Sequence, residues 1–238
     1  MHNGYISDYK AIAVQMAGLM APECYAGIKG RTDSEALAAL YMTYLTAGSE
    51  HQNTSQQGQE KGIGGQAWEK MYSTQEMFEA LQNTVNTIIE LQKVALGGRR
   101  SPNDLNVCVT DGRQLVACRF RNHKTEQPPS LYWSTSAGVT LNRKFPDHPD
   151  GAESPHGKCT EDVMGTHGQK VNAHNPYMTK KAAEHGKHVI VASEPTTYKK
   201  CEWNLIEKNR TILVEADGTE RIKEITYERK VDDVDWES

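Results

Sequence analysis

The sequence predicts an α+β fold with an antiparallel sheet, and three observations support this prediction. Apolar residues at helical spacing fill the N-terminal part of the chain, and β-rich runs fill much of the remainder. Two Asp-Gly dipeptides, 111–112 and 217–218, each join a pair of these runs, and Asp-Gly in that setting is a strong hairpin signal. Helices followed by hairpins are typical of helices packed on an antiparallel sheet.

Three helices are expected in the N-terminal part, over residues 5–20, 33–47 and 68–94. The first and third show an apolar stripe at helical spacing, whereas the second is an Ala-rich run of good helix formers. Either Thr32 or Asp33 can serve as the N-cap of the second helix.

Strands are expected over residues 105–122, 130–138, 188–195 and 210–228. The first and last of these stretches contain the two Asp-Gly dipeptides, so each predicts a hairpin. The stretch 188–195, HVIVASEP, has the continuous apolar run of a buried strand.

Two polar segments interrupt these elements. Residues 48–66 are rich in Gly, Ser and Gln, which predicts a flexible loop. Residues 145–187 form a long insert crowded with Pro, Gly and His, and an irregular stretch of that length is either functional or disordered.

The charge balance and the cysteines limit the possible partners and compartment. Lys and Arg total 27 against 31 Asp and Glu, a net charge of −4, so no basic footprint for nucleic acid or an anionic membrane is present. The sequence as written has neither a secretory signal nor a transmembrane stretch. Its five scattered cysteines are typical of reduced thiols, which predicts a cytoplasmic protein.

Three short motifs carry candidate chemistry: His2-Asn3-Gly4, the stretch GRTDSE at 30–35, and the stretch ASEP at 192–195. Asn and Gly tolerate positive φ, so residues 3 and 4 are expected to form a turn in front of the first helix. Such a turn presents backbone N–H groups outward, which suits an oxyanion. Each motif also has an ordinary explanation, namely a turn, a helix cap and a strand end.

Taken together and in this order, the motifs resemble those of the class II glutamine amidotransferases. These are N-terminal-nucleophile hydrolases with a four-layer α/β/β/α sandwich of antiparallel sheets. The resemblance implies that the Asn3 side-chain amide and the Gly4 N–H form an oxyanion hole. It also implies that the carboxylate of Asp33 binds the α-ammonium group of a glutamine or γ-glutamyl substrate.

Longer stretches of the sequence resemble one particular group within this family. The stretches LNVCVTDGRQLVACRFRNH, PPSLYWSTSAG and GKHVIVASEPTTY look like the fungal amidotransferase-like subunit of the cytosolic glutathione-degrading complex. This likeness implies hydrolysis of a γ-glutamyl amide in glutathione degradation and a peptidase-like partner subunit. No cofactor and no metal are expected.

The family's nucleophile, an N-terminal cysteine, lies upstream of the HNG motif, together with the first strands and an arginine for the substrate carboxylate. None of these has a counterpart in this chain, which opens at the motif. We therefore expect residues 1–238 to be the C-terminal greater part of one glutamine amidotransferase type 2 domain, N-terminally truncated, lacking the first strands of the sandwich, and inactive as written.

Two alternatives remain open at this point. The chain could instead be a non-catalytic binding subunit of a peptidase complex. The insert could hold a zinc ion, although its ligand spacing is not that of a zinc site and a solvated loop explains it better. The residues concerned are His148, His156, Cys159, His167, His174 and His185. The sequence does not decide between glutathione and glutamine, and the aromatic residues Tyr132, Trp133 and Trp203 are assigned to core packing.

Overall fold

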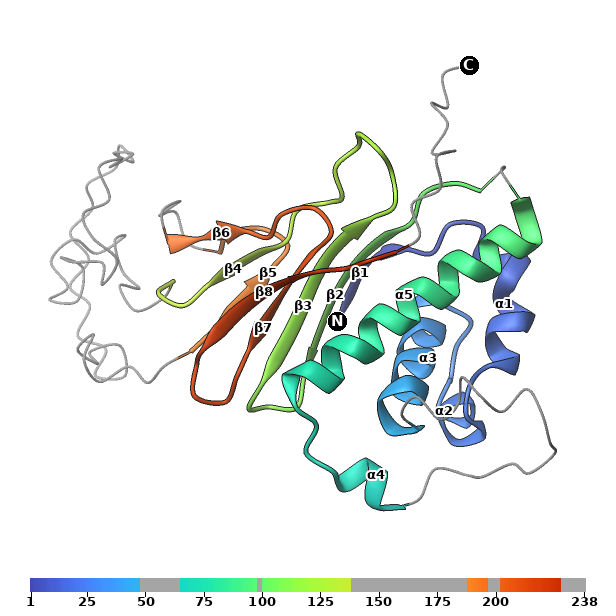
Figure 1. Ribbon diagram of the computed structural model, residues 1–238, viewed down its shortest axis with the longest axis horizontal. Helices are drawn as coiled ribbons and strands as arrows, with labels where there is room; N and C mark the ends of the chain where they lie inside the picture. Colours follow the sequence, from blue (N-terminus) through green and yellow to red (C-terminus); the bar gives the residue numbers. More distant parts are fainter. Residues whose placement is uncertain (48–64, 98–99, 138–187, 197–201, 228–238) are drawn as a thin grey trace, which may run out of the picture. The chain divides into compact units, whose positions relative to one another are not determined.

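The computed structural model describes residues 1–47, 65–97, 100–137, 188–196 and 202–227 (Figure 1). The chain divides into two compact units, one made of Met1–Pro129 with Glu207–Ser238 and the other of Ser130–Ile206. The insert 145–187 lies outside the described residues, and so does the loop 48–66 apart from its last two residues, which begin a short helix.

A five-stranded antiparallel sheet forms one layer of the first unit. Its strands are β1 (His2–Tyr5), β2 (Asp104–Thr110), β3 (Leu115–Arg121), β7 (Arg210–Val214) and β8 (Glu220–Glu224), in the order β1-β2-β3-β7-β8. Both Asp-Gly hairpins are confirmed, and the glycines adopt the positive φ that these turns need, 89° at Gly112 and 85° at Gly218.

The described part of the chain forms five helices beside this sheet: α1 (Tyr9–Gly18), α2 (Pro22–Ala26), α3 (Asp33–Ala47), α4 (Gly65–Glu69) and α5 (Thr74–Leu96). The expected helix 33–47 is confirmed with its bounds. The expected helix 5–20 is shorter, because Pro22 begins a separate helix and the residues before Tyr9 belong to a strand and its connection. The expected helix 68–94 is divided, so that Trp68 belongs to α4.

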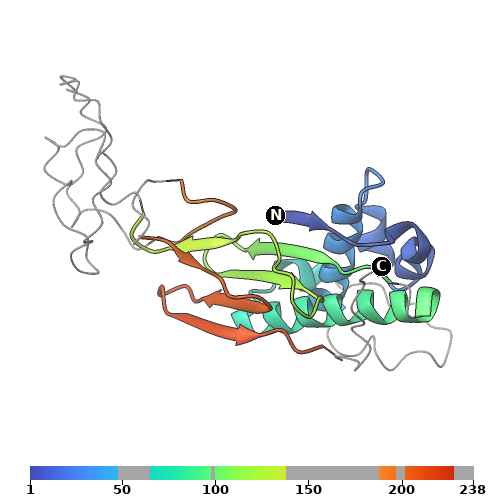
Figure 2. The same cartoon turned by 90° about the horizontal axis from the view of Figure 1, so that it is seen from above.

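The start of α5 follows from its own sequence. The Ser73 hydroxyl accepts from the Glu76 N–H while the Glu76 carboxylate accepts from the Ser73 N–H, which is a capping box. Gly97, with φ of 59°, ends the helix. In Figures 1 and 2, α5 runs alongside the sheet, and it contacts β3 and β7.

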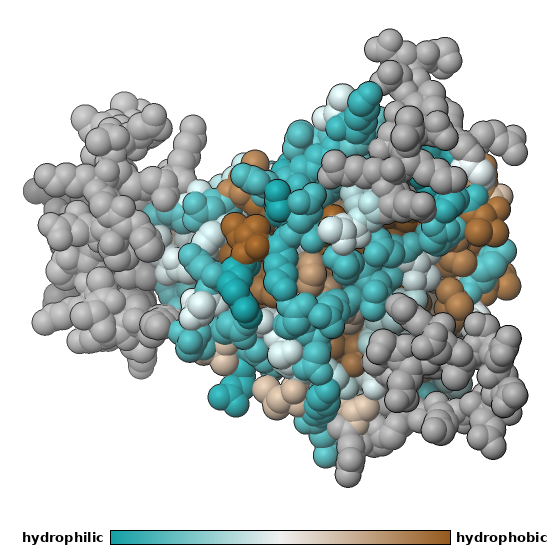
Figure 3. Space-filling model, viewed as in Figure 1, coloured by the Kyte–Doolittle hydropathy of each residue, from teal (hydrophilic) through white to brown (hydrophobic). Residues whose placement is uncertain are grey.

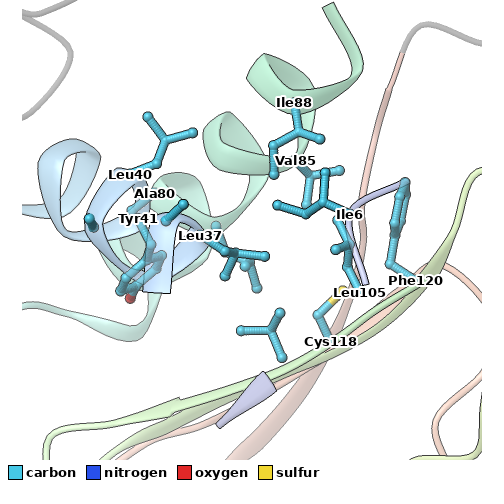
Figure 4. Close-up of a cluster of buried hydrophobic side chains, with 14 of the residues drawn as sticks. Ile6, Leu37, Leu40, Tyr41, Ala80, Val85, Ile88, Leu105, Cys118 and Phe120 are labelled. Carbon is cyan, nitrogen blue, oxygen red and sulfur yellow. The ribbon is translucent and has the colours of Figure 1, made fainter. Parts of the chain in front are cut away.

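The main hydrophobic core lies between the helices and the five-stranded sheet. Figure 4 shows the side chains of Ile6, Leu37 and Ile88 gathered with Leu105 and Phe120, so the β1 end, α3, α5, β2 and β3 all contribute. On the face that Figure 3 shows, by contrast, hydrophobic side chains lie in separate patches among hydrophilic ones. This two-layer arrangement confirms the α+β prediction.

The HNG motif is a strand and not the turn that its local sequence predicts. His2 pairs with Val107 and Gly4 with Leu105, so the motif forms the edge strand β1. Pairing with β2 gives alternate residues of β1 ladder hydrogen bonds, whereas the backbone groups of the residues between them face the open edge of the sheet. The left-handed backbone conformation that is typical of a turn occurs instead at Asp8, which has a φ of 52° and lies between β1 and α1.

The second unit contains a three-stranded antiparallel sheet in the order β5-β4-β6. The strands are β4 (Tyr132–Ser134), β5 (Ile190–Ala192) and β6 (Asn204–Leu205). The stretch 188–195 does form a strand, but β5 is only half-buried, so the expectation of a buried strand is wrong. Trp203 is buried as expected, whereas Tyr132 and Trp133 are half-buried. Among the described helices, none has the length and apolar character to cross a membrane.

Gly4 provides a test of the β1 pairing. Its φ is 147°, and a Cβ atom added there would lie 2.0 Å from the Asp104 carbonyl oxygen, which is backbone and cannot rotate away. We expect Gly4→Ala to lower the free energy of unfolding by more than the roughly 1–3 kcal/mol that backbone strain alone costs. Urea unfolding measures this difference.

Gly112→Ala is the matched control, because Gly112 also has a positive φ, of 89°, but no atom lies within 4 Å of its added Cβ. Its loss of stability should reflect backbone strain alone. Equal losses in the two variants would show that β1 does not approach β2 as closely as described.

Candidate functional site

Asp33 stands at the first residue of α3 and joins that helix to β1. Its Oδ2 accepts a hydrogen bond from the Ile6 N–H at 2.7 Å, and its Oδ1 accepts one from the Ser34 N–H at 2.8 Å. The carboxylate therefore bonds its own first turn, as the ordinary explanation of the motif predicts. It also bonds Ile6, the residue that follows β1 and lies two residues beyond Gly4.

Thr32, not Asp33, is the N-cap of α3. Thr32 Oγ1 accepts from the Glu35 N–H at 3.2 Å, and the Glu35 carboxylate accepts in return from Thr32 and from the Gly30 N–H. The Gly30 N–H, followed by Thr32, holds the pKa of Glu35 below its ordinary value. Because Thr32 and Glu35 complete the cap, the Asp33 carboxylate is not needed as the N-cap and can accept the Ile6 N–H after β1.

A second contact between β1 and α3 involves the first residue of the HNG motif. His2 Nδ1 and Ser34 Oγ are 2.8 Å apart. Burial lowers the pKa of His2, although the Asp33 carboxylate acts in the opposite direction. At neutral pH His2 is therefore an uncharged imidazole that shares one hydrogen bond with the α3 N-terminus.

The connection between β1 and α1 is held by buried amide side chains. Asn103 Oδ1 accepts from the Ser7 N–H at 2.9 Å, and Gln92 Nε2 donates to the Ser7 carbonyl. Asn103 Nδ2 donates to Gln92 Oε1 at 2.8 Å, and the Asn103 N–H donates to Asn122 Oδ1. These four residues are all buried, so this network fixes the backbone next to Ile6.

The two other expected site residues lie on β1. Asn3 pairs with Asn106 and is exposed, and Gly4 pairs with Leu105. The Ile6–Asp33 hydrogen bond places Asp33 at the end of this same short strand. The structure thus brings the three expected residues to one edge of the first unit.

An open depression of about 610 Å³ lies beside Asp33. It is formed by the first turns of α1 and α3 and the residues just before them. The lining residues are Asp8, Tyr9, Lys10, Ala11, Arg31, Thr32 and Asp33. Asn3 and Gly4 do not line it.

The depression carries both signs of charge, with Lys10 and Arg31 beside Asp8 and Asp33. A zwitterionic amino-acid group needs this combination. Burial and the Asp33 carboxylate raise the pKa of Tyr9, so its hydroxyl stays protonated at neutral pH. Sequence reasoning missed Lys10 and Arg31, and the position of Arg31 two residues before Asp33 was the one available signal.

The described cysteines are not activated thiols. Burial raises the pKa of Cys24 and of Cys108, and it raises the pKa of the fully buried Cys118 to about 12. A thiol needs a lowered pKa to be a good nucleophile at neutral pH. No group of His, Cys, Asp and Glu suited to a metal ion occurs in the described part of the chain, and the histidine-rich insert lies outside it.

The fold is similar to that of a known class of domain. A solved structure of a glutamine aminotransferase class-II domain protein from Silicibacter pomeroyi matches 94% of this chain and 65% of its own, with a TM-score of 0.52 and 19% identity. This likeness shows that the chain shares the fold of that class-II domain.

A curated relative is similar to the chain in sequence. The chain is 24% identical over 216 residues to the probable glutamine amidotransferase DUG3 of Saccharomyces cerevisiae, covering 90% of this chain and 48% of the relative. The chain thus spans about half the length of that relative. No family model matches the sequence. The resemblance to the class II amidotransferases expected from the motifs is confirmed by these two similarities.

The lowered pKa of His2 predicts a pH-dependent contribution to stability. The unfolded chain takes up this proton near pH 6.5, before the folded chain does. The free energy of unfolding should therefore fall as the pH drops from about 6.5 toward the folded pKa. His2→Gln, which keeps a polar side chain but does not titrate, should remove this part of the dependence.

Urea unfolding of both chains at pH 7.5 and at lower pH values measures the effect. The informative quantity is the difference between wild type and variant, because the other histidines contribute equally to both. A difference that does not change with pH would show that His2 is not buried as described.

Proposed function

We propose that this chain carries the oxyanion-stabilising and ammonium-binding parts of a γ-glutamyl amide hydrolase site. The observation that carries the proposal is the carboxylate of Asp33, which lies at the first residue of α3, bonds the Ile6 N–H directly after β1, and borders an open depression. The likeness in sequence to a probable glutamine amidotransferase supports it.

The geometry of Asp33 supports the proposed role. Each of its oxygens accepts one backbone N–H, and a carboxylate oxygen has a second lone pair for a further donor. A substrate ammonium group in the depression would complete this arrangement with a charge-assisted hydrogen bond. Lys10 and Arg31 supply positive charge nearby for the substrate's α-carboxylate.

Asn3 and Gly4 are proposed to stabilise the oxyanion. Both belong to β1, whose pairing with β2 holds the backbone in one conformation. Such preorganised donors favour the developing negative charge on the γ-carbonyl oxygen without reorganising during the reaction. Asp33 bonds the residue that directly follows this strand, so the groups proposed to bind the two ends of the substrate are held close to one another.

We expect the 238-residue chain to bind a γ-glutamyl ligand without hydrolysing it. In the class that it resembles, a cysteine thiolate attacks the γ-carbonyl. The described cysteines have raised pKa values and are fully or partly buried. Glutathione as the natural substrate, a peptidase-like partner and a cytoplasmic location stay predictions.

Calorimetric titration with L-glutamine and with glutathione tests the role of Asp33. Asp33→Asn keeps an acceptor for the Ile6 N–H but removes the charge. We expect it to weaken binding about 10- to 100-fold, as the loss of a charge-assisted hydrogen bond does. In the same samples we expect no release of glutamate.

Asp8→Asn is the matched control, because Asp8 is another carboxylate of the same depression. It should change the affinity by less than about threefold, because it only alters the general charge. If both variants bind equally well, Asp33 is not the ammonium site. Release of glutamate by the wild-type chain would contradict the expected lack of hydrolysis.

A further inference from the structure

Two hydrogen bonds tie β1 to the first turn of α3, and they flank Asn3 and Gly4 in the sequence. His2 Nδ1 lies 2.8 Å from Ser34 Oγ, and the Ile6 N–H donates to Asp33 Oδ2 at 2.7 Å. A strand tied at one point can pivot about it, whereas a strand tied at both ends keeps its orientation. The segment between the two anchors is the one proposed to bind the oxyanion.

The His2–Ser34 contact joins the direct neighbours of two proposed site residues. His2 precedes Asn3, and Ser34 follows Asp33. Because adjacent Cα atoms are about 3.8 Å apart and the peptide is planar, fixing one residue restricts its neighbour. A displacement of β1 from α3 would therefore move Asn3 away from Asp33.

The contact with Ser34 is what links the His2 ring to α3. His2 is half-buried, and its ring also lies near the Asp33 carboxylate and the Asp104 backbone. The contact between Nδ1 and Ser34 Oγ is the one that joins the ring to the first turn of α3. A serine hydroxyl can donate or accept, so the bond is compatible with either tautomer of the imidazole.

We propose that His2 and Ser34 are positioning residues, and that the hydrogen bond between them sets the separation between the oxyanion groups on β1 and the carboxylate of Asp33. The inference rests on the function proposed above for these groups. Neither side chain needs to touch the substrate, because each acts through its neighbour in the sequence.

Amide hydrogen exchange of the full chain without ligand tests whether this contact holds β1. In Ser34→Ala, we expect the amides of residues 4–6 to exchange about 3- to 10-fold faster, the range that one lost hydrogen bond gives. Ser34→Thr keeps a hydroxyl and should restore the wild-type rates. Unchanged rates in Ser34→Ala would overturn the proposal, whatever the chain binds.

Calorimetric titration with two probes tests whether the contact positions Asp33. The probes are L-glutamine and glutaramate, which is glutamine without its α-amino group. We expect Ser34→Ala to lose about 3- to 10-fold in affinity for L-glutamine and to keep its affinity for glutaramate, because only L-glutamine contacts Asp33. Ser34→Thr should again restore the wild-type values.

A merely structural role would weaken both probes equally, and that outcome would also overturn the proposal. A wild-type chain that binds the two probes equally would contradict the ammonium-binding role of Asp33 instead. In that case the exchange rates would still show whether His2 and Ser34 hold β1. The two failures are therefore distinguishable.

Discussion

The hydrogen bond from the Ile6 N–H to Asp33 Oδ2 is the contact on which the geometry of the candidate site depends. It joins the residue that directly follows the edge strand β1 to the first turn of α3, a helix that packs in the core. Because Thr32 and Glu35 complete the helix cap, Asp33 is free to make this connection. A substrate bound at Asp33 would therefore have a fixed distance to Asn3 and Gly4.

Buried amide side chains also hold the backbone of the residue that follows Ile6. Ser7 follows Ile6 directly, and its backbone bonds Asn103 and Gln92 in the interior. Removing one partner of a buried hydrogen bond costs about 1–3 kcal/mol, so the network strongly favours one arrangement of the Ile6–Ser7 backbone. Residues from α5 and from the segment before β2 thus determine where the Ile6 N–H points.

Local patterns in the sequence predicted the elements that depend on local interactions. The Asp-Gly hairpins and the helix over Asp33–Ala47 are examples. The HNG motif was predicted as a turn because Asn and Gly favour turns locally, but β1 pairs with residues about one hundred positions later, and no local pattern reports such a pairing. For the same reason Asp33 was recognised from its motif, whereas Lys10 joins the site only through the packing of α1 beside α3.

A crystal structure of the chain with bound L-glutamine would test the proposed site most directly. We expect the α-ammonium group within hydrogen-bonding distance of Asp33, which is about 2.7–3.2 Å for such a pair. We also expect the side-chain carbonyl oxygen to face Asn3 and Gly4. A ligand bound elsewhere, or one that meets Asp33 through its side-chain amide, would contradict the assignment of Asp33 and of the HNG strand to the two ends of the substrate.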